Sequence, residues 1–242
     1  DADPQRTRDI GQYSHDGEFG HADAQCAEGQ GGKTLENGWS RAVLLNFLDA
    51  RLFETQGKAL TNFRKNLPEP MSDLAQQTLK DPYNFDFLTM RENYNERELE
   101  DALTTNITRF LLELGSGFAF VGRQVRLEVN GNEYFIDLLF YHLKLRCYTV
   151  VELKVTEFKP EYLGQLGFYV TAVNRQLRRT EDNPTIGLII CKTKDRVVAE
   201  YALEGTNQPL GISQYDLMKV TSEELKNTLP SIEEIENELN EK

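Results

Sequence analysis

Apolar residues recur at the three- and four-residue spacing of an amphipathic helix in several stretches of the chain. The clearest stretch, residues 95–114, places Leu103 and Ile107 on one face. Gly115 follows it, as is typical of the C-terminal end of a helix. Further helices are predicted over residues 35–53, 72–80, 160–177 and 195–203, with an acidic helical segment over residues 222–240.

Other stretches alternate apolar and polar residues, or are short apolar runs bounded by turn residues, as is typical of strands. The segments "FAFVGRQVRLEV" and "NEYFIDLLFYHL" flank Asn130-Gly131, a residue pair that favours a type I′ hairpin turn. Strands are predicted over residues 118–129, 132–143, 145–155, 184–193 and 210–217. The order of elements from residue 95 is αβββαβαβα, which indicates an α/β domain with a mixed central sheet flanked by helices.

The same pattern divides the chain into parts. Residues 1–33 show no periodicity and are rich in Gly and small polar residues, so we expect an arm that is disordered or atypical of the fold. Residues 34–82 contain a short helical region and a linker with the two prolines of "NLPEPMSD". Residues 83–235 contain the α/β domain, and residues 236–242 form an acidic tail.

Composition excludes some classes of protein. No stretch approaches the roughly 18 to 20 uninterrupted apolar residues of a membrane span, and no secretory signal is visible, so we expect no membrane partner and a cytoplasmic location. The three cysteines lie far apart, and Cys147 and Cys191 lie in apolar strand-like runs, which favours reduced, buried thiols. The cysteines and the three scattered histidines lack the spacing of a zinc site.

The formal net charge of −12 argues against a protein that simply coats nucleic acid, because such proteins are usually basic. The charges are unevenly distributed, however. Residues 121–196 carry 12 Lys and Arg against 9 Asp and Glu, whereas the rest of the chain carries 15 against 30. A locally basic part therefore lies within an acidic chain.

Asp137, Glu152 and Lys154 lie inside the most apolar of the predicted strands. Ionised groups are seldom buried without partners, because the loss of hydration costs several kcal/mol per ion. If Lys144-Leu145 forms a two-residue loop, or a four-residue loop is centred there, Asp137 lies opposite Glu152 and the two carboxylates repel each other. A three-residue loop would instead place the two carboxylates on opposite faces of the sheet.

An opposed pair of carboxylates needs a shared proton or a cation. Alternation along the strand places Lys154 on the face of Glu152, while Val151 and Leu153 point into the core. Two carboxylates and one ammonium in a small patch suit a hard cation such as Mg²⁺ beside a phosphate. The alternative is a surface salt bridge between Glu152 and Lys154 on a half-exposed strand.

Helical angles identify a third carboxylate. Glu100 falls inside the apolar stripe of its helix, which makes it a candidate for a metal-binding or water-positioning role. Glu98 faces solvent and, with Asn95 as N-cap, fits a capping box. Glu96 lies near the inward face at the frayed first turn, where an acid is favourable to the helix dipole.

Gln165 and Tyr169 are four residues apart and share one flank of the helix predicted over 160–177. They either brace the carboxylates or touch a phosphate, or they form an ordinary polar rim. Basic residues also accumulate in this half of the chain, where they are candidates for contacts with a phosphate backbone. These residues are Arg123, Arg126, Lys159, Arg175, Arg178, Arg179, Lys192, Lys194 and Arg196.

Asp137 is followed by "ELK" at Glu152 to Lys154, and then by the helical segment "QLGFY". This order, with a helical Glu before it, resembles the PD-(D/E)xK nuclease pattern and its RecB-like branch with a Q-x-x-x-Y helix. The segments "DPYNFDFL", "ERELEDAL", "FLLELGSGFAFVGRQ" and "YFIDLLFYH" resemble more narrowly the YhcG-like bacterial proteins. The resemblance extends from residue 35 to about residue 235, and Ile136 stands where the pattern has Pro.

The resemblance implies a restriction-endonuclease-like αβββαβ core and a metal-dependent phosphodiesterase acting on nucleic acid, with DNA as the expected substrate. Asp137, Glu152 and the backbone carbonyl of Leu153 would hold Mg²⁺, for which Mn²⁺ substitutes, and Glu100 would help directly or through water. Lys154 would orient or help to deprotonate the attacking water and offset charge in the transition state.

A second function remains open, namely a catalytically weak module of the same fold that binds nucleic acid or protein. The intact catalytic pattern favours the enzyme, and the acidic total charge favours the module. The resemblance also implies that residues 34–82 are what remains of an N-terminal helical domain. The apolar face of the helix predicted over residues 35–53 would remain unburied and would permit a homo-oligomer.

Overall fold

A mixed sheet of seven strands forms the centre of the computed structural model, which describes residues 55–217. Its order is β1-β7-β6-β5-β4-β3, and β2 pairs with a further part of β7. The strands are β1 (Leu60–Thr61), β2 (Tyr83–Asn84), β3 (Phe118–Val129), β4 (Asn132–His142), β5 (Cys147–Glu157), β6 (Ile186–Thr193) and β7 (Leu210–Asp216). The described helices are α4 (Phe63–Asn66), α5 (Met71–Thr78), α6 (Glu96–Thr105), α7 (Ile107–Leu114), α8 (Tyr162–Gln176) and α9 (Arg196–Glu204).

The predicted order of elements is confirmed from α6 to β7, and the mixed α/β class with it. The sheet is antiparallel from β3 to β5 and parallel from β5 to β7. The predictions for residues 1–33, 35–53 and 222–240, including the oligomer through the N-terminal region, lie outside the described residues. No helix within residues 55–217 combines the length and the apolar character needed to cross a bilayer.

The single helix predicted over residues 95–114 is wrong in one respect, because the structure divides it into α6 and α7. Asn106 leaves the helical conformation, with φ −102° and ψ 35°. Its side-chain amide donates to the carbonyl of Ala102 at 3.0 Å and competes with the backbone ladder. The break follows Thr104 and Thr105, two β-branched residues of lower helix propensity.

The two hairpins of the sheet have turns of different length. Asn130 and Gly131 have φ angles of 51° and 77°, as the predicted type I′ turn requires. The turn between β4 and β5 contains four residues, 143–146, rather than two. His142 nevertheless pairs with Cys147 and Leu138 with Val151, so the predicted register is confirmed.

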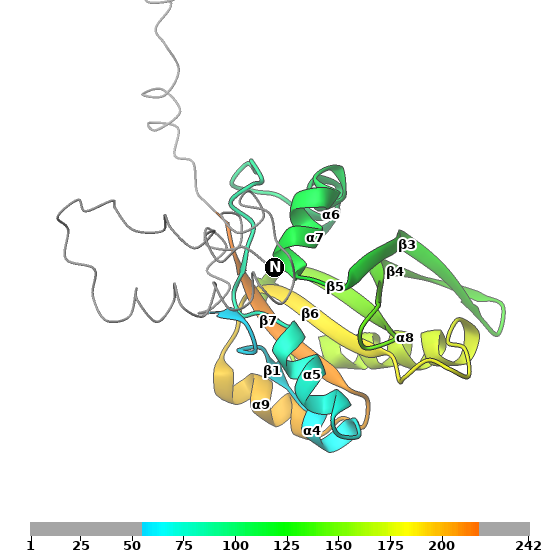
Figure 1. Cartoon of the computed structure of the whole chain (residues 1–242). Helices are drawn as coiled ribbons and strands as arrows, with labels where there is room; N and C mark the ends of the chain where they lie inside the picture. The colour runs from blue at the N-terminus through cyan, green and yellow to red at the C-terminus, as the bar shows by residue number, and fades with distance from the viewer. Residues whose placement is uncertain (1–54, 218–242) are drawn as a thin grey trace, which may run out of the picture. The chain divides into compact units, whose positions relative to one another are not determined.

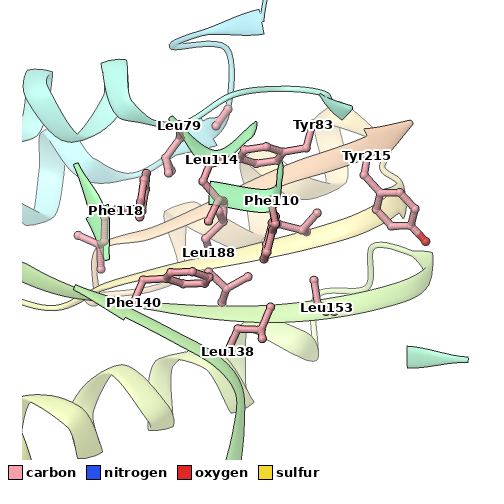
Figure 2. Packing of buried hydrophobic residues seen from close by; sticks show 14 of the residues in the cluster. Leu79, Tyr83, Phe110, Leu114, Phe118, Leu138, Phe140, Leu153, Leu188 and Tyr215 are labelled. Carbon is pink, nitrogen blue, oxygen red and sulfur yellow. The ribbon is translucent and has the colours of Figure 1, made fainter. Parts of the chain in front are cut away.

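Two apolar cores lie on the two faces of the sheet. One core contains residues of the helices α4, α5, α6 and α7 and residues of the sheet such as Leu138, Leu153 and Leu188. Figure 2 shows aromatic residues of this core around Phe110 and Phe140. The other joins α8 and α9 to the opposite face. Figure 1 shows α6 and α7 on one side of β5 and β6 and α8 on the other side.

The apolar core and the sheet both include residues from before the predicted domain boundary at residue 83. β1 pairs with β7, and Phe63, Ala75 and Leu79 belong to the same core as α6 and α7. Residues 59–79 therefore take part in the fold of the sheet rather than acting only as a linker.

Candidate active site

β4 and β5 separate at Asp137. Their ladder ends at the pair Leu138 and Val151, whereas β3 and β4 stay paired to the tip of their hairpin and leave the sheet as a two-stranded arm (Figure 1). Oδ2 of Asp137 accepts a hydrogen bond from the backbone N–H of Leu153 at 3.0 Å. The carboxylate therefore bridges the two strands where their backbones no longer pair.

Glu152 lies on β5 with only 1% of its surface exposed. Neither carboxylate oxygen forms a hydrogen bond of good geometry with the described residues, and Nζ of Lys154 lies 3.7 Å from Oε2. Burial, followed by the charge of Asp137, raises the pKa of Glu152 to about 8. A carboxyl group in such a place is either protonated or compensated by a cation.

The pKa of Asp137 is raised as well. Burial raises its pKa, and the N–H of Leu153 and the ammonium of Lys154 oppose this shift. The pKa of both Asp137 and Glu152 is thus raised when no further cation is near. A divalent cation between them would lower the pKa of both.

Glu100 on α6 is 2% exposed, in agreement with its predicted place in the apolar stripe. Its Oε1 lies 3.6 Å from Nε of Arg123, and its Oε2 accepts a hydrogen bond from Nε2 of Gln124. The same Gln124 amide donates to Oδ1 of Asp137 at 3.4 Å. One amide group thus connects Glu100 to Asp137.

The ammonium of Lys154 lies between acids of two elements. Nζ is 3.7 Å from Oε2 of Glu152 and 3.8 Å from Oε2 of Glu96 on α6, and it lies 5.3 Å from the ring centroid of Tyr162. Glu96 is therefore an ion-pair partner and not only an acid at the helix start. The alternative of a half-exposed salt bridge between Glu152 and Lys154 is wrong, because both side chains are buried.

Asn95 and Glu98 form the predicted capping box at the start of α6. This motif fixes where the helix begins, and Glu96 and Glu100 then follow on the turn that lies against β5. A local hydrogen-bond pattern that is readable in the sequence thus positions two of the acids.

Gln165 and Tyr169 form one unit on α8, since Nε2 of Gln165 donates to the hydroxyl of Tyr169 at 3.1 Å. Tyr169 is buried. Burial raises its pKa, and the charges of Glu152 and Asp137 act in the same direction. Within the described residues no hydrogen bond joins the pair to these carboxylates, so its role stays a prediction.

Several predicted nucleic-acid-binding residues already bind acids of the chain. Arg123 forms an ion pair with Asp101, and Arg126 lies 2.6 Å from Glu133. The side chain of Lys194 is only 8% exposed and forms an ion pair with Asp81, so its contact with a phosphate stays a prediction.

The remaining predicted cations lie at the surface. Nε of Arg178 donates to the carbonyl of Asp182 at 3.0 Å, and Nε of Arg196 lies 2.8 Å from Glu200. Lys159, Arg175, Arg179 and Lys192 are exposed as well. These surface positions remain compatible with phosphate contacts.

The donor set can be tested against a metal ion. Across residues 55–217, no cluster of three or more His, Cys, Asp and Glu side chains is arranged to hold a metal. The candidate set is smaller, with carboxylates of Asp137 and Glu152 and, as predicted additions, the Leu153 carbonyl and Glu100. Carboxylate oxygens are the ligands that Mg²⁺ prefers, and those of Glu152 are buried without a hydrogen bond of good geometry to the described residues. The set fits a hard divalent cation whose other ligands are water or phosphate oxygens.

Gln124 is the residue of this site that sequence reasoning missed. Its φ of 46° is unusual for a side-chain-bearing residue and places its amide between Glu100 and Asp137. The strand pattern contained no sign of this conformation, because alternation along a strand predicts the face of each side chain and not the φ angle of a single residue. The only signal for Gln124 in the sequence was that it ends "FVGRQ", part of a segment that resembles the YhcG-like proteins.

An open hollow of about 720 Å³ lies beside Asp137. It is lined by residues of α6, β3, β4 and β5, among them Glu96, Glu100, Gln124 and Phe135. The hollow therefore gives solvent access to Asp137, and it borders the buried Glu100, whereas Glu152 does not line it.

A mixed sheet whose central strands separate at an acid, with a second acid and a lysine two residues apart on the next strand, defines the PD-(D/E)xK class of nuclease domains. The chain belongs to the YhcG PDDEXK nuclease domain family, whose model matches residues 76–230. Members of this class generally use divalent metal ions.

A relative and two solved structures extend the comparison. The chain is 35% identical over 211 residues to the YhcG protein of Escherichia coli (strain K12), a match that takes in 84% of this chain and 56% of that protein. The chain thus spans about half the length of this curated relative. A repair endonuclease from Pyrococcus abyssi matches with a TM-score of 0.35 and 13% identity, over 55% of this chain and 50% of that one. A complex of EndoMS with double-stranded DNA matches with a TM-score of 0.37 and 14% identity, over 57% of this chain and 49% of that one.

Proposed function

We propose that this chain is a metal-dependent nuclease that hydrolyses phosphodiester bonds in DNA, with Mg²⁺ as cofactor and Mn²⁺ as a substitute. The observation that carries the proposal is the buried carboxyl of Glu152, which forms no hydrogen bond of good geometry with the described residues and lies beside Asp137 and Lys154. Membership of a nuclease domain family supports phosphodiester hydrolysis over other uses of a metal site.

In this proposal Asp137 and Glu152 hold the cation together with the Leu153 carbonyl, and Glu100 assists directly or through water. The N–H of Leu153 orients the carboxylate of Asp137, and the amide of Gln124 orients that of Glu100. When bound, the cation supplies Lewis-acid stabilisation of the charge that develops on the scissile phosphate.

Lys154 orients the attacking water and assists its deprotonation. Its ammonium is fixed by acids on two elements, Glu152 and Glu96, so little reorganisation is needed during the reaction. It also offsets negative charge that builds up on the phosphate. Gln165 and Tyr169 support the carboxylates from the side of α8.

In this proposal exposed cations contact the phosphate backbone, namely Lys159, Arg175, Arg178 and Arg179. Arg123 and Arg126 also contact it, after their ion pairs with Asp101 and Glu133 are replaced by ion pairs with phosphates. Such contacts position the strand but do not read its sequence. Cys147 and Cys191 are buried free thiols, which supports a cytoplasmic location.

A cleavage assay tests the proposal. Plasmid, single-stranded DNA, branched DNA and RNA are each incubated with the protein in Mg²⁺, Mn²⁺ or EDTA. We expect cutting that depends on the metal and falls at least about 100-fold in Asp137→Asn, which removes a ligand of the cation, and in Lys154→Met, which removes the ammonium that offsets charge on the phosphate. Glu157→Gln and Lys144→Ala change exposed residues of the same hairpin region and serve as matched controls.

The outcomes separate the two candidate functions. Cutting that is equal in wild type and both variants would point to a contaminating nuclease and contradict the proposal. Binding without cutting under every condition would favour the catalytically weak module.

A further inference from the structure

The hollow beside Asp137 has an aromatic wall. Phe135 lines it together with Asp137 and Glu100 and is 44% exposed. Among the exposed large apolar side chains of residues 55–217, Phe135 is the only one that lines this hollow. An aromatic ring thus borders the space that a substrate needs in order to reach the acids.

Phe135 is exposed because its strand neighbours occupy the inner face of the arm. Ile136 is buried against α8, and the ring of Tyr134 lies 4.7 Å from the ring of Phe168 on that helix. Alternation along β4 then leaves Phe135 on the face of Asp137. Within the described part of the chain, no aromatic ring packs against Phe135, so its face is available to a ligand.

The distance between ring and acid suits a nucleotide. Two residues along a strand span about 7 Å, so a base stacked on Phe135 lies one nucleotide away from a phosphate at Asp137. Arg97 also lines the hollow, is exposed, and forms no ion pair with the described residues. It offers a cation to the next phosphate of the strand.

We propose that Phe135 stacks on an unpaired base next to the scissile phosphate, so that this site acts on single-stranded segments in preference to continuous duplex. This inference rests on the proposed nuclease function and names its substrate class. Within a duplex both faces of each base are covered by neighbouring bases, whereas a base in a single strand can be placed on an aromatic ring. The competing explanation is an isolated exposed apolar residue, which is common on protein surfaces.

Binding without metal tests the stacking step apart from cleavage. A DNA single strand that carries 2-aminopurine, and the same strand in a duplex, are titrated with the full chain in EDTA. We expect quenching of the single strand, and about tenfold weaker binding by Phe135→Ala with the quenching lost. Phe135→Trp retains both, and Tyr201→Ala, which removes a ring that is 75% exposed on α9 outside the hollow, changes neither.

Cleavage of the two substrates in Mg²⁺ completes the test. Phe135→Ala should slow cutting of the single strand about tenfold and leave cutting of the duplex nearly unchanged. Equal loss on both substrates, or no loss on either, overturns the inference while the proposed nuclease function stands. Quenching that depends on Phe135 without any cutting supports the stacking site and contradicts the nuclease. A wild-type chain that neither binds nor cuts contradicts both.

Discussion

Asp137 and Glu152 are held where each acid lacks the solvation that it would have in water. Burial raises the pKa of both carboxyl groups, and the Lys154 ammonium at 3.7 Å compensates Glu152 only in part. The free energy for this arrangement is supplied by the surrounding core, because Leu153 and Val151 on the same strand are fully buried. The result is a site whose stability depends on protons or on a cation.

Glu152 therefore makes the metal-free protein less stable as the pH increases. Its pKa is about 8 in the folded chain against 4.5 for the ordinary group, so between these values the folded state binds more protons than the unfolded state. The free energy of unfolding should fall across this window by up to about 1.4 kcal/mol per pH unit. Urea denaturation in EDTA at several pH values between 5 and 8 measures the slope.

Glu152→Gln should flatten this slope, and Glu157→Gln, at an exposed position of the same strand, should not. Mg²⁺ should also reduce the slope, because the cation favours the ionised carboxylate. A slope that is identical in wild type and Glu152→Gln would show that the titration belongs to other groups.

The β4–β5 hairpin decides the geometry of the site at the scale of elements. Nδ1 of His142 accepts a hydrogen bond from the backbone N–H of Leu145 at 3.0 Å and so organises the four-residue turn. That turn sets the register that brings Asp137 close to Glu152. Gly117 lies against the same histidine, since a Cβ there would come within 2.9 Å of its ring.

Gly117→Ala should destabilise the fold more than Gly115→Ala does. Both glycines have positive φ angles, 101° and 108°, so both substitutions carry backbone strain. Only the change at Gly117 also pushes a methyl group into His142, because nothing lies within 4 Å of the corresponding position at Gly115. The difference should be about 1 to 3 kcal/mol, as measured by chemical denaturation, and equal losses would mean that the ring moves aside freely.

At the scale of the whole molecule, residues 60–84 close one edge of the sheet and are tied to the helical layer. β1 and β2 both pair with β7. Lys80 forms a buried ion pair with Glu113 of α7 at 3.1 Å, and the backbone N–H of Asn84 donates to the same carboxylate at 2.9 Å. Elements far apart in sequence thus depend on one buried carboxylate.

Glu113→Ala should cost about 3 to 5 kcal/mol of unfolding free energy, because it breaks a buried ion pair and removes the carboxylate that accepts from the N–H of Asn84. Lys80→Met combined with Glu113→Leu should recover much of that loss, since two apolar residues replace two buried charges. Glu200→Ala removes a carboxylate from an exposed ion pair with Arg196 and should change stability little. Thermal or urea denaturation of the four proteins tests this, and a loss for Glu113→Ala as small as that for Glu200→Ala would contradict it.

The sequence by itself determined the order of most elements and most acids of the site, and it left the register to the length of one loop. Hydrophobic periodicity is a local property, so it was sufficient for the order αβββαβαβ and for placing Glu100 on a buried helical face. A two- or four-residue β4–β5 loop about the same centre pairs the same residues, and the structure excludes the three-residue loop that would have separated the two carboxylates. The resemblance to PD-(D/E)xK nucleases rested on these same positions.

Only the tertiary structure decided how these parts meet. The left-handed backbone of Gln124, the ion pair of Glu96 with Lys154 and the ion pair of Lys194 with Asp81 all join residues from different elements. The break at Asn106 and the packing of residues 59–79 across the predicted domain boundary are of the same kind. Such features depend on which surfaces are available once the sheet has formed, and a periodic pattern along the chain carries no information about them.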